Sequence, residues 1–294
     1  MGDGPDGFDI DNVIIADNIF TSYCRGVYVW DYADNGNIGS FAITGNTFTD
    51  SIYSSGVRLM AGGYGSPVVT PTLEGPVNIL DNTFTQLSPI VNGQGVSMID
   101  VRVSAESATS RLNVTGNEIT FVGPFSVSTY GMILRGPITN VTIDGNTLDG
   151  GGAGGTYADM PPTSGIYIKS KDATYGSVST STVIDITDNI ITGFVNGVSI
   201  YDTVAAAYGG LPSGAGLALH NNAITGNTDG IVSSVGEITD ATRNWWGAIS
   251  GPLDDKTLPN IPNYNNPSGE GDTVTPYVEY SPCLLYTSPS PETV

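Results

Sequence analysis

The chain repeats one short pattern of apolar and polar positions. An apolar residue alternates with any residue twice, and then Gly or Asp (Asn in the copy at 216–224), Asn, any residue and a final apolar residue follow. Alternation with period two predicts a β-strand. The pair formed by Gly or Asp and the following Asn predicts a tight or left-handed turn. Seven copies occur, at 12–20, 40–48, 76–84, 111–119, 140–148, 183–191 and 216–224.

We call this pattern the first phrase. A second short pattern, the second phrase, follows each copy of it. It begins with Gly and continues as apolar, any and usually apolar, at 26–30, 56–60, 95–99, 131–135, 165–169, 197–201 and 230–234. The shortest spacings, from Asn18 to Gly26 and from Gly230 to Asn244, together give a repeat of about 22 residues. That length is too short for a propeller blade of about 40–45 residues and suits one turn of a solenoid with two or three short strands.

The alternation also predicts the interior. Ile143, Ile168, Ile186 and Ile200 occupy inward positions of successive repeats and should be buried. The turn asparagines, from Asn18 to Asn222, should stack as a hydrogen-bonded ladder rather than form a binding site.

The C-terminal part contains the most specific motif. The segments "RNWWGAISGP" (243–252), "NPSGEGD" (266–272) and "VEYSP" (278–282) resemble the closing segment of secreted and surface modules among the right-handed parallel β-helix proteins of the pectin-lyase-like superfamily. The resemblance covers roughly residues 7–282. It implies an all-β fold, a single-stranded right-handed parallel β-helix of about seven coils over 1–242, closed by a capping segment over 243–282.

The capping segment has a physical purpose. The end of such a solenoid exposes unpaired backbone and an open core, and Trp245 and Trp246 offer the apolar area to cover it.

Both ends of the chain depart from this pattern. "CLLYTSPSPETV" (283–294) resembles the translation of a sequencing adaptor, so we expect this tail to be non-native and to pack on nothing. Cys283 would then belong to the tail, and Cys24 would be unpaired. Because the pattern begins at about residue 7 without an N-terminal cap, we expect the chain to be part of a larger protein.

Composition narrows the partners. Acidic residues outnumber basic ones 29 to 9, and the net charge is −20, so nucleic acid and anionic membranes are not expected partners. No apolar run is long enough for a membrane span. One histidine, His220, excludes sites with several histidines, and we expect it on the surface. No cofactor is expected, although the Asp-rich stretch 3–11 leaves Ca²⁺ as a weak candidate.

Stacking the second phrases predicts two outward columns. The residues two after each Gly are Tyr28, Arg58, Ser97, Ile133, Tyr167, Ser199 and Val232, and those four after it are Trp30, Met60, Ile99, Arg135, Lys169, Tyr201 and Ser234. Cations and aromatic rings collect there, which is the chemistry of a carbohydrate-binding face. The candidate substrate-binding residues are Tyr28, Trp30, Arg58, Arg135, Tyr167, Lys169 and Tyr201.

Three interpretations of this face remain open. The polysaccharide lyases of the superfamily neutralise a uronate carboxylate with a cation and remove the neighbouring proton with Lys, Arg or Tyr, so the resemblance implies Lys169, Tyr201 and Arg135 as catalytic residues of a lyase or epimerase. The superfamily's calcium cluster, Asp pairs and Tyr-Gly-Asp-Pro-His motif are absent, which favours non-catalytic contact with carbohydrate. A solvated face on a structural spacer of an adhesin is the third.

The acidic residues that follow the second phrases add no carboxylate pair to this face. Asp31, Asp100 and Asp202 occupy non-adjacent repeats, and we expect them to form turns.

The function that the resemblance favours is a secreted or cell-surface module that contacts a polysaccharide or extracellular matrix glycan, because the closing segment resembles that of secreted and surface modules. A fold alone does not decide this, since one fold hosts many functions.

Overall fold

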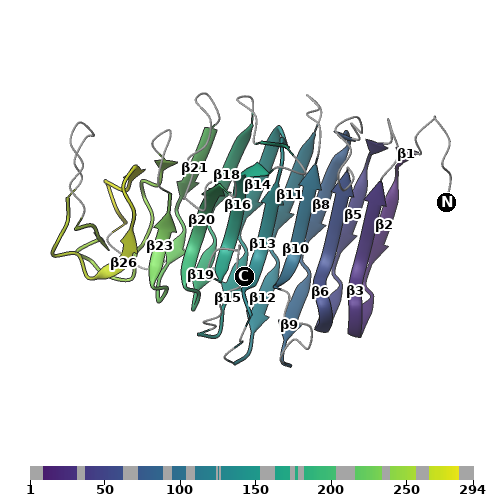
Figure 1. Ribbon diagram of the computed structural model, residues 1–294, viewed down its shortest axis with the longest axis horizontal. Coiled ribbons are helices and arrows are strands. Elements are labelled where there is room, and N and C mark those ends of the chain that lie inside the picture. Colours follow the sequence, from purple (N-terminus) through teal and green to yellow (C-terminus); the bar gives the residue numbers. More distant parts are fainter. Residues whose placement is uncertain are drawn as a thin grey trace, which may run out of the picture.

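The protein is built of parallel β-strands (Figure 1). The structure, a computed structural model, describes residues 9–31, 37–61, 72–88, 95–103, 110–123, 125, 127–152, 163–172, 176–177, 182–202, 216–233, 239–255 and 265–284. Within these ranges no residue is helical, so none of them belongs to a helix that could cross a membrane. All-β structure is thereby confirmed. Of the paired strands, β16 and β17 alone run antiparallel.

The seven first phrases, followed by two C-terminal strands, form a nine-stranded parallel sheet in chain order. Its strands are β2 (Val13–Ala16), β5 (Phe41–Thr44), β8 (Pro76–Leu80), β11 (Arg111–Thr115), β14 (Asn140–Asp144), β18 (Val183–Thr187), β21 (Gly216–His220), β24 (Thr239–Asp240) and β27 (Val278–Glu279). Equivalent residues of successive copies face each other, as Val114, Ile143 and Ile186 do.

A fifteen-stranded sheet has two limbs. The short limb holds β9 (Thr83–Gln86), β12 (Glu118–Phe121), β15 (Thr147–Asp149), β19 (Ile190–Thr192) and β22 (Ala223–Ile224). The long limb holds β10 (Val96–Val103), β13 (Thr129–Arg135), β16 (Ser164–Asp172), β20 (Asn196–Asp202), β23 (Asp229–Val232), β26 (Gly271–Val274) and β25 (Pro252–Leu253). Two long strands, β3 (Ile19–Asp31) and β6 (Thr47–Ala61), run through both limbs.

Four short strands complete the set. β17 (Gly176–Ser177) adds to β16, and a three-stranded parallel sheet contains β1 (Asp9–Ile10), β4 (Asn37–Ile38) and β7 (Thr72–Leu73). The strands follow one another along the long axis of the molecule, so each repeat lies beside the next (Figure 1).

The apolar core runs between the sheets. Ile143, Ile168, Ile186 and Ile200 are fully buried, which confirms the prediction from period two. Aromatic rings stack in register at one end: the ring centroids of Phe20 and Phe48 are 4.7 Å apart, and those of Phe48 and Phe84 are 4.6 Å apart. Stacked rings at this spacing add to the free energy of burial.

The predicted asparagine ladder exists. The side-chain oxygen of each rung accepts hydrogen bonds from the backbone N–H and the amide of the rung before it; at Asn82 and Asn117 both distances are 3.0 Å. The residue preceding each rung has a positive φ of 54–66°, from Asp17 to Arg243. The rungs are Asn18, Asn46, Asn82, Asn117, Asn146, Asn189, Asn222 and Asn244.

The glycines of the second phrases mark a close approach between backbones. A Cβ added to Gly165 would lie 2.5 Å from Ile191 and 2.7 Å from the carbonyl oxygen of Gly197. Gly26, Gly56, Gly131 and Gly197 are equally crowded by the next repeat. A side chain at these positions would push adjacent repeats apart.

One repeat departs from the predicted register. Gly56 faces Met98, because Ser97 pairs with Ser55 and Ile99 with Val57. The phrase that begins at Gly95 is therefore shifted by three residues from its predicted place. Ile99 is fully buried rather than outward, and Ser97 leaves the predicted outer column.

The C-terminal segment packs on the last repeats. Trp246 is fully buried in the core, whereas Trp245 is partly exposed and bridges to Ala223. The expectation that residues 283–294 pack on nothing is wrong for the first two. Cys283 lies against the core, and the backbone N–H of Leu284 donates to Asn244 at 3.0 Å. Residues 285–294 lie outside the described part of the chain.

Candidate functional site

The outer face of the long limb gathers most of the predicted site residues. Strand register places two columns side by side. The first contains Tyr28, Arg58, Asp100, Ile133, Tyr167, Ser199 and Val232. The second contains Trp30, Met60, Arg102, Arg135, Lys169 and Tyr201. Four cations thus occupy consecutive strands, and we call Arg58, Arg102, Arg135 and Lys169 the basic row.

A buried carboxylate holds one end of the basic row. Oδ2 of Asp100 lies 2.9 Å from a terminal nitrogen of Arg58 and 2.6 Å from one of Arg102. The Nε of Arg102 also donates to Oδ1 of Asp100 at 2.8 Å, so this contact is bidentate. Because Asp100 is fully buried and paired, the interpretation that it forms a turn is wrong.

The charges in this cluster shift each other's titration. Burial by itself raises the pKa of Asp100, but Arg102 and Arg58 outweigh it and hold that pKa below its usual range. Burial lowers the pKa of Arg58, and the nearby Arg102, Arg25 and Arg135 lower it further, against the opposing effect of Asp100. Two guanidinium groups, those of Arg58 and Arg102, thus share the single negative charge of Asp100.

The predicted exposure of this face is wrong over its middle. The side chains of Arg135 and Lys169 are side by side, as predicted, but each residue is only 8% exposed. Tyr167 is fully buried and packs with Ile133 and Tyr130 in a small second apolar cluster, with the two tyrosine rings 5.5 Å apart. Tyr201 pairs with Lys169 through the backbone, and its side chain lies outside the described part of the structure.

The edge strand β3 carries the accessible end of the site. Tyr28 and Trp30 are 37% and 43% exposed, and their ring centroids are 6.1 Å apart. The guanidinium carbon of Arg25 lies 4.5 Å above the ring of Tyr28, a cation–π contact. Tyr28 faces Arg58 across the strand pair, so aromatic and cationic groups meet here.

Sequence reasoning missed four members of this cluster, namely Arg25, Asp100, Arg102 and Tyr130. Asp100 and Arg102 follow the same alternation as the rest of β10. Aligning that alternation, rather than the nearest glycine, would have placed both residues in the outer columns.

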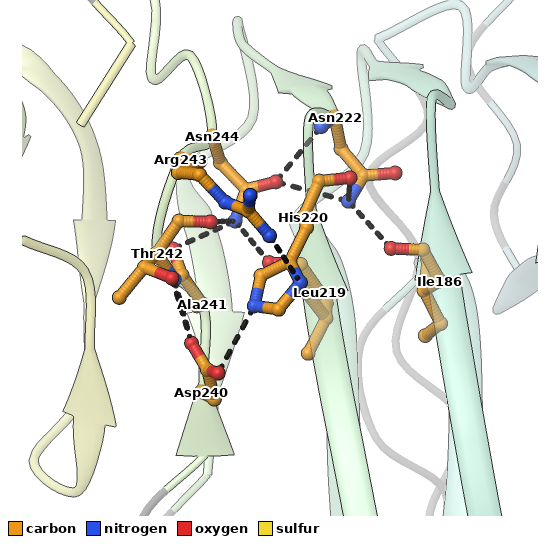
Figure 2. Close-up of polar contacts among 9 residues, drawn as sticks. All are labelled: Ile186, Leu219, His220, Asn222, Asp240, Ala241, Thr242, Arg243 and Asn244. Atoms are coloured by element: carbon orange, nitrogen blue, oxygen red, sulfur yellow. Dashed lines mark hydrogen bonds and ion pairs between the residues drawn. The ribbon is translucent and has the colours of Figure 1, made fainter. Parts of the chain in front are cut away.

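A second polar cluster surrounds the histidine (Figure 2). Nε2 of His220 lies 3.0 Å from Oδ2 of Asp240, and its Nδ1 lies 3.1 Å from a terminal nitrogen of Arg243. Since arginine only donates, Nδ1 of His220 is the acceptor in its contact with Arg243. Partial burial raises the pKa of Asp240, but hydrogen bonds from His220 and Thr242 outweigh it and lower that pKa overall.

Nε2 and Nδ1 of His220 face the side chains of Asp240 and Arg243, respectively, and we assign no catalytic role to this imidazole. The cluster instead links β21 to the capping segment. His220 is partly exposed, with 19% of its side chain accessible, and is not the simple surface residue that we expected.

Within the described ranges, no three His, Cys, Asp or Glu side chains gather in a way that could hold a metal ion. The Asp-rich stretch considered for Ca²⁺ lies largely outside these ranges, and Cys24 and Cys283 are free thiols.

The chain was compared with family models, with curated proteins and with solved structures, and none of the three comparisons gave a match.

Proposed function

We propose that the chain is a right-handed parallel β-helix of about seven coils. The nine-stranded sheet takes its strands in repeat order, and parallel strands joined by crossovers adopt the right-handed path almost without exception. The asparagine ladder supports the same architecture, because it requires equivalent turns to lie directly above one another.

The function proposed for this module is contact with acidic carbohydrate outside the cell, without catalysis. The observation that carries it is the meeting of Tyr28, Trp30 and Arg25 with the basic row on a protein of net charge −20. Exposed aromatic rings stack on sugar rings, and guanidinium groups pair with carboxylate or sulfate in bidentate geometry. Arg58 would lend its charge to the same end of the face.

A uronate lyase or epimerase is the alternative. It would use Lys169 or Tyr201 as the base and Arg135 to neutralise the substrate carboxylate. The burial of Arg135 and Lys169 favours the non-catalytic function, since a general base must come within hydrogen-bond reach of the proton that it removes.

The test is binding to an array of uronate-containing, sulfated and neutral glycans. We expect binding to acidic glycans that weakens as salt rises, because exposed charge attraction is screened over about 8–10 Å. The variants Trp30→Ala and Arg25→Ala should each weaken it. Arg111→Ala removes an exposed cation from β11 on the other sheet and serves as the matched control.

Three results would decide against the proposal. They are the absence of binding to any acidic glycan, binding unaffected by Trp30→Ala and Arg25→Ala, and an equal loss with Arg111→Ala. Release of unsaturated uronate products, followed by ultraviolet absorbance and abolished by Lys169→Ala, would support the lyase instead.

A further inference from the structure

The outer face of the short limb is an array of threonines. In each repeat, two outward residues flank one inward residue, as Thr47 and Thr49 flank the buried Phe48. Nine of the fourteen outward positions are Thr, in the pairs Ile19/Thr21, Thr47/Thr49, Thr83/Thr85, Glu118/Thr120, Thr147/Asp149, Ile190/Thr192 and Ala223/Thr225. We call this set the threonine face.

The preference of strands for threonine does not by itself explain this content. The same seven repeats present fourteen outward positions on the nine-stranded sheet, and only four of those are Thr, at Thr44, Thr115, Thr142 and Thr187. Threonine is therefore concentrated on one of two faces that have the same number of outward positions and are both built from parallel strands.

The threonine face contributes little to the protein's own side-chain hydrogen bonds. Across the ranges that the structure describes, none of the nine makes a side-chain hydrogen bond to another protein group. Thr187 of the other face, in contrast, donates to Asp144 at 2.7 Å. All fourteen positions are exposed or partly exposed, so the nine hydroxyls are available to bind water.

The spacing of these groups is regular in two directions. Neighbouring parallel strands lie about 4.8 Å apart, and residues two apart on one strand lie about 6.6 Å apart. The register shows no shift between the short-limb strands from β6 to β22, so the array continues across the limb. Each threonine adds a methyl group beside its hydroxyl, which limits how the bound water can orient.

We propose that the threonine face binds ice. The spacing between neighbouring strands is close to an oxygen–oxygen repeat of hexagonal ice, and a rigid array of hydroxyl and methyl groups can hold water molecules in such a lattice. This activity is separate from the glycan contact proposed for the long limb.

Ice fits this face better than a crystalline polysaccharide does. Proteins grip sugar surfaces with exposed aromatic rings, and the fourteen positions contain none. Glu118 and Asp149 are the charged members of the set, so the face is nearly neutral on a strongly acidic protein. Because ice carries no net charge, a protein surface that binds it needs no charged side chains.

The experiment measures thermal hysteresis and ice-crystal shape with the whole chain. We expect a gap between the melting and freezing points, together with faceted crystals. The double variant Thr49→Tyr/Thr120→Tyr, whose rings would stand up from the array, should lose most of that gap. The control Thr44→Tyr/Thr115→Tyr places the same rings in the same repeats on the other sheet and should retain it.

Circular dichroism and the unfolding midpoint establish that both double variants fold. Absence of hysteresis in the wild-type chain, or equal hysteresis in both folded variants, would overturn the proposal. So would binding to microcrystalline cellulose or chitin that Thr49→Tyr/Thr120→Tyr abolishes while hysteresis is absent. If that variant fails to fold, Thr49→Ser/Thr120→Ser removes only the methyl groups and should still reduce the gap.

Discussion

The side-chain amide of Asn222 donates to Oδ1 of Asn244 at 2.9 Å, so the last rung of the asparagine ladder comes from the capping segment (Figure 2). Asn244 in turn donates to the carbonyl oxygens of Leu219 and Ala241. Asn244, in the C-terminal segment, is thus held by the same hydrogen-bond pattern that joins one repeat to the next.

Removing a middle rung should destabilise the whole fold. Asn117→Ala deprives the backbone N–H and the amide of Asn82 of their acceptor, and leaves the carbonyl oxygens of Ile79 and Thr115 without that donor. Because unsatisfied buried groups cost about 1–3 kcal/mol each, we expect a loss of at least about 2 kcal/mol in the free energy of unfolding. Chemical denaturation measures it.

The control is Asn113→Ala on β11 of the same repeat, whose half-buried side chain contacts Asn78 at 2.7 Å and can exchange that partner for water. It should cost less than about 1 kcal/mol. Equal losses in the two variants would mean that the ladder has no special weight.

Gly165→Ala should destabilise the protein through backbone crowding. The new methyl group would press on Ile191 and on the carbonyl oxygen of Gly197, and overpacking of this kind costs about 1–3 kcal/mol. Gly216→Ala is the matched control, because a Cβ there meets nothing closer than 3.9 Å, and it should change stability by less than about 0.5 kcal/mol. Thermal unfolding of both variants checks the difference.

Asp100→Asn should be strongly destabilising at neutral pH. It leaves Arg58 and Arg102 buried without their counter-charge, and breaking a buried pair from one side costs about 3–5 kcal/mol. The pKa of Asp100 in the folded protein lies below that of the unfolded chain. The ion pairs therefore stabilise the fold above the unfolded pKa, and this stabilisation disappears as pH falls toward the folded pKa.

The wild-type protein should consequently lose more stability on acidification below about pH 4 than the Asp100→Asn variant does. Denaturant titrations at a series of pH values give this difference. Parallel curves for the two proteins would show that Asp100 does not titrate as proposed.

Asp272 should give the opposite pH dependence. Burial raises its pKa to about 6, although hydrogen bonds from Asn227 and Gly226 favour the ionised form and nearby Asp229 opposes it. The folded protein therefore binds this proton more tightly than the unfolded chain, in which the pKa is near 3.8. The contribution of Asp272 to stability should fall as pH rises from about 4 to about 6 and stay constant above that range.

The difference in unfolding free energy between the wild type and Asp272→Asn isolates this contribution from other carboxylates. If that difference does not vary between pH 4 and pH 7, Asp272 has an ordinary pKa in the folded protein.

Local pattern was sufficient to predict some features and not others. The burial of Ile143 and the stacking of the asparagines follow from side-chain alternation and turn chemistry, which act over a few residues. The prediction for β10 is wrong because Gly95 imitates the start of a phrase, and the ion pair of Asp100 with Arg58, which marks the true register, joins residues far apart in the sequence. The burial of Lys169 likewise depends on residues that are far from it in the sequence.

The asparagine ladder has a direction. From Asn18 to Asn222, each rung donates its side-chain amide to the side-chain oxygen of the next rung, so each rung offers an acceptor to the rung before it and needs one from the rung after it. The repeats are therefore interchangeable units with unlike ends. If one whole repeat were removed or duplicated between two rungs, each rung would still find an acceptor on the rung after it. A protein of this kind can change length by whole repeats and keep its closing segment.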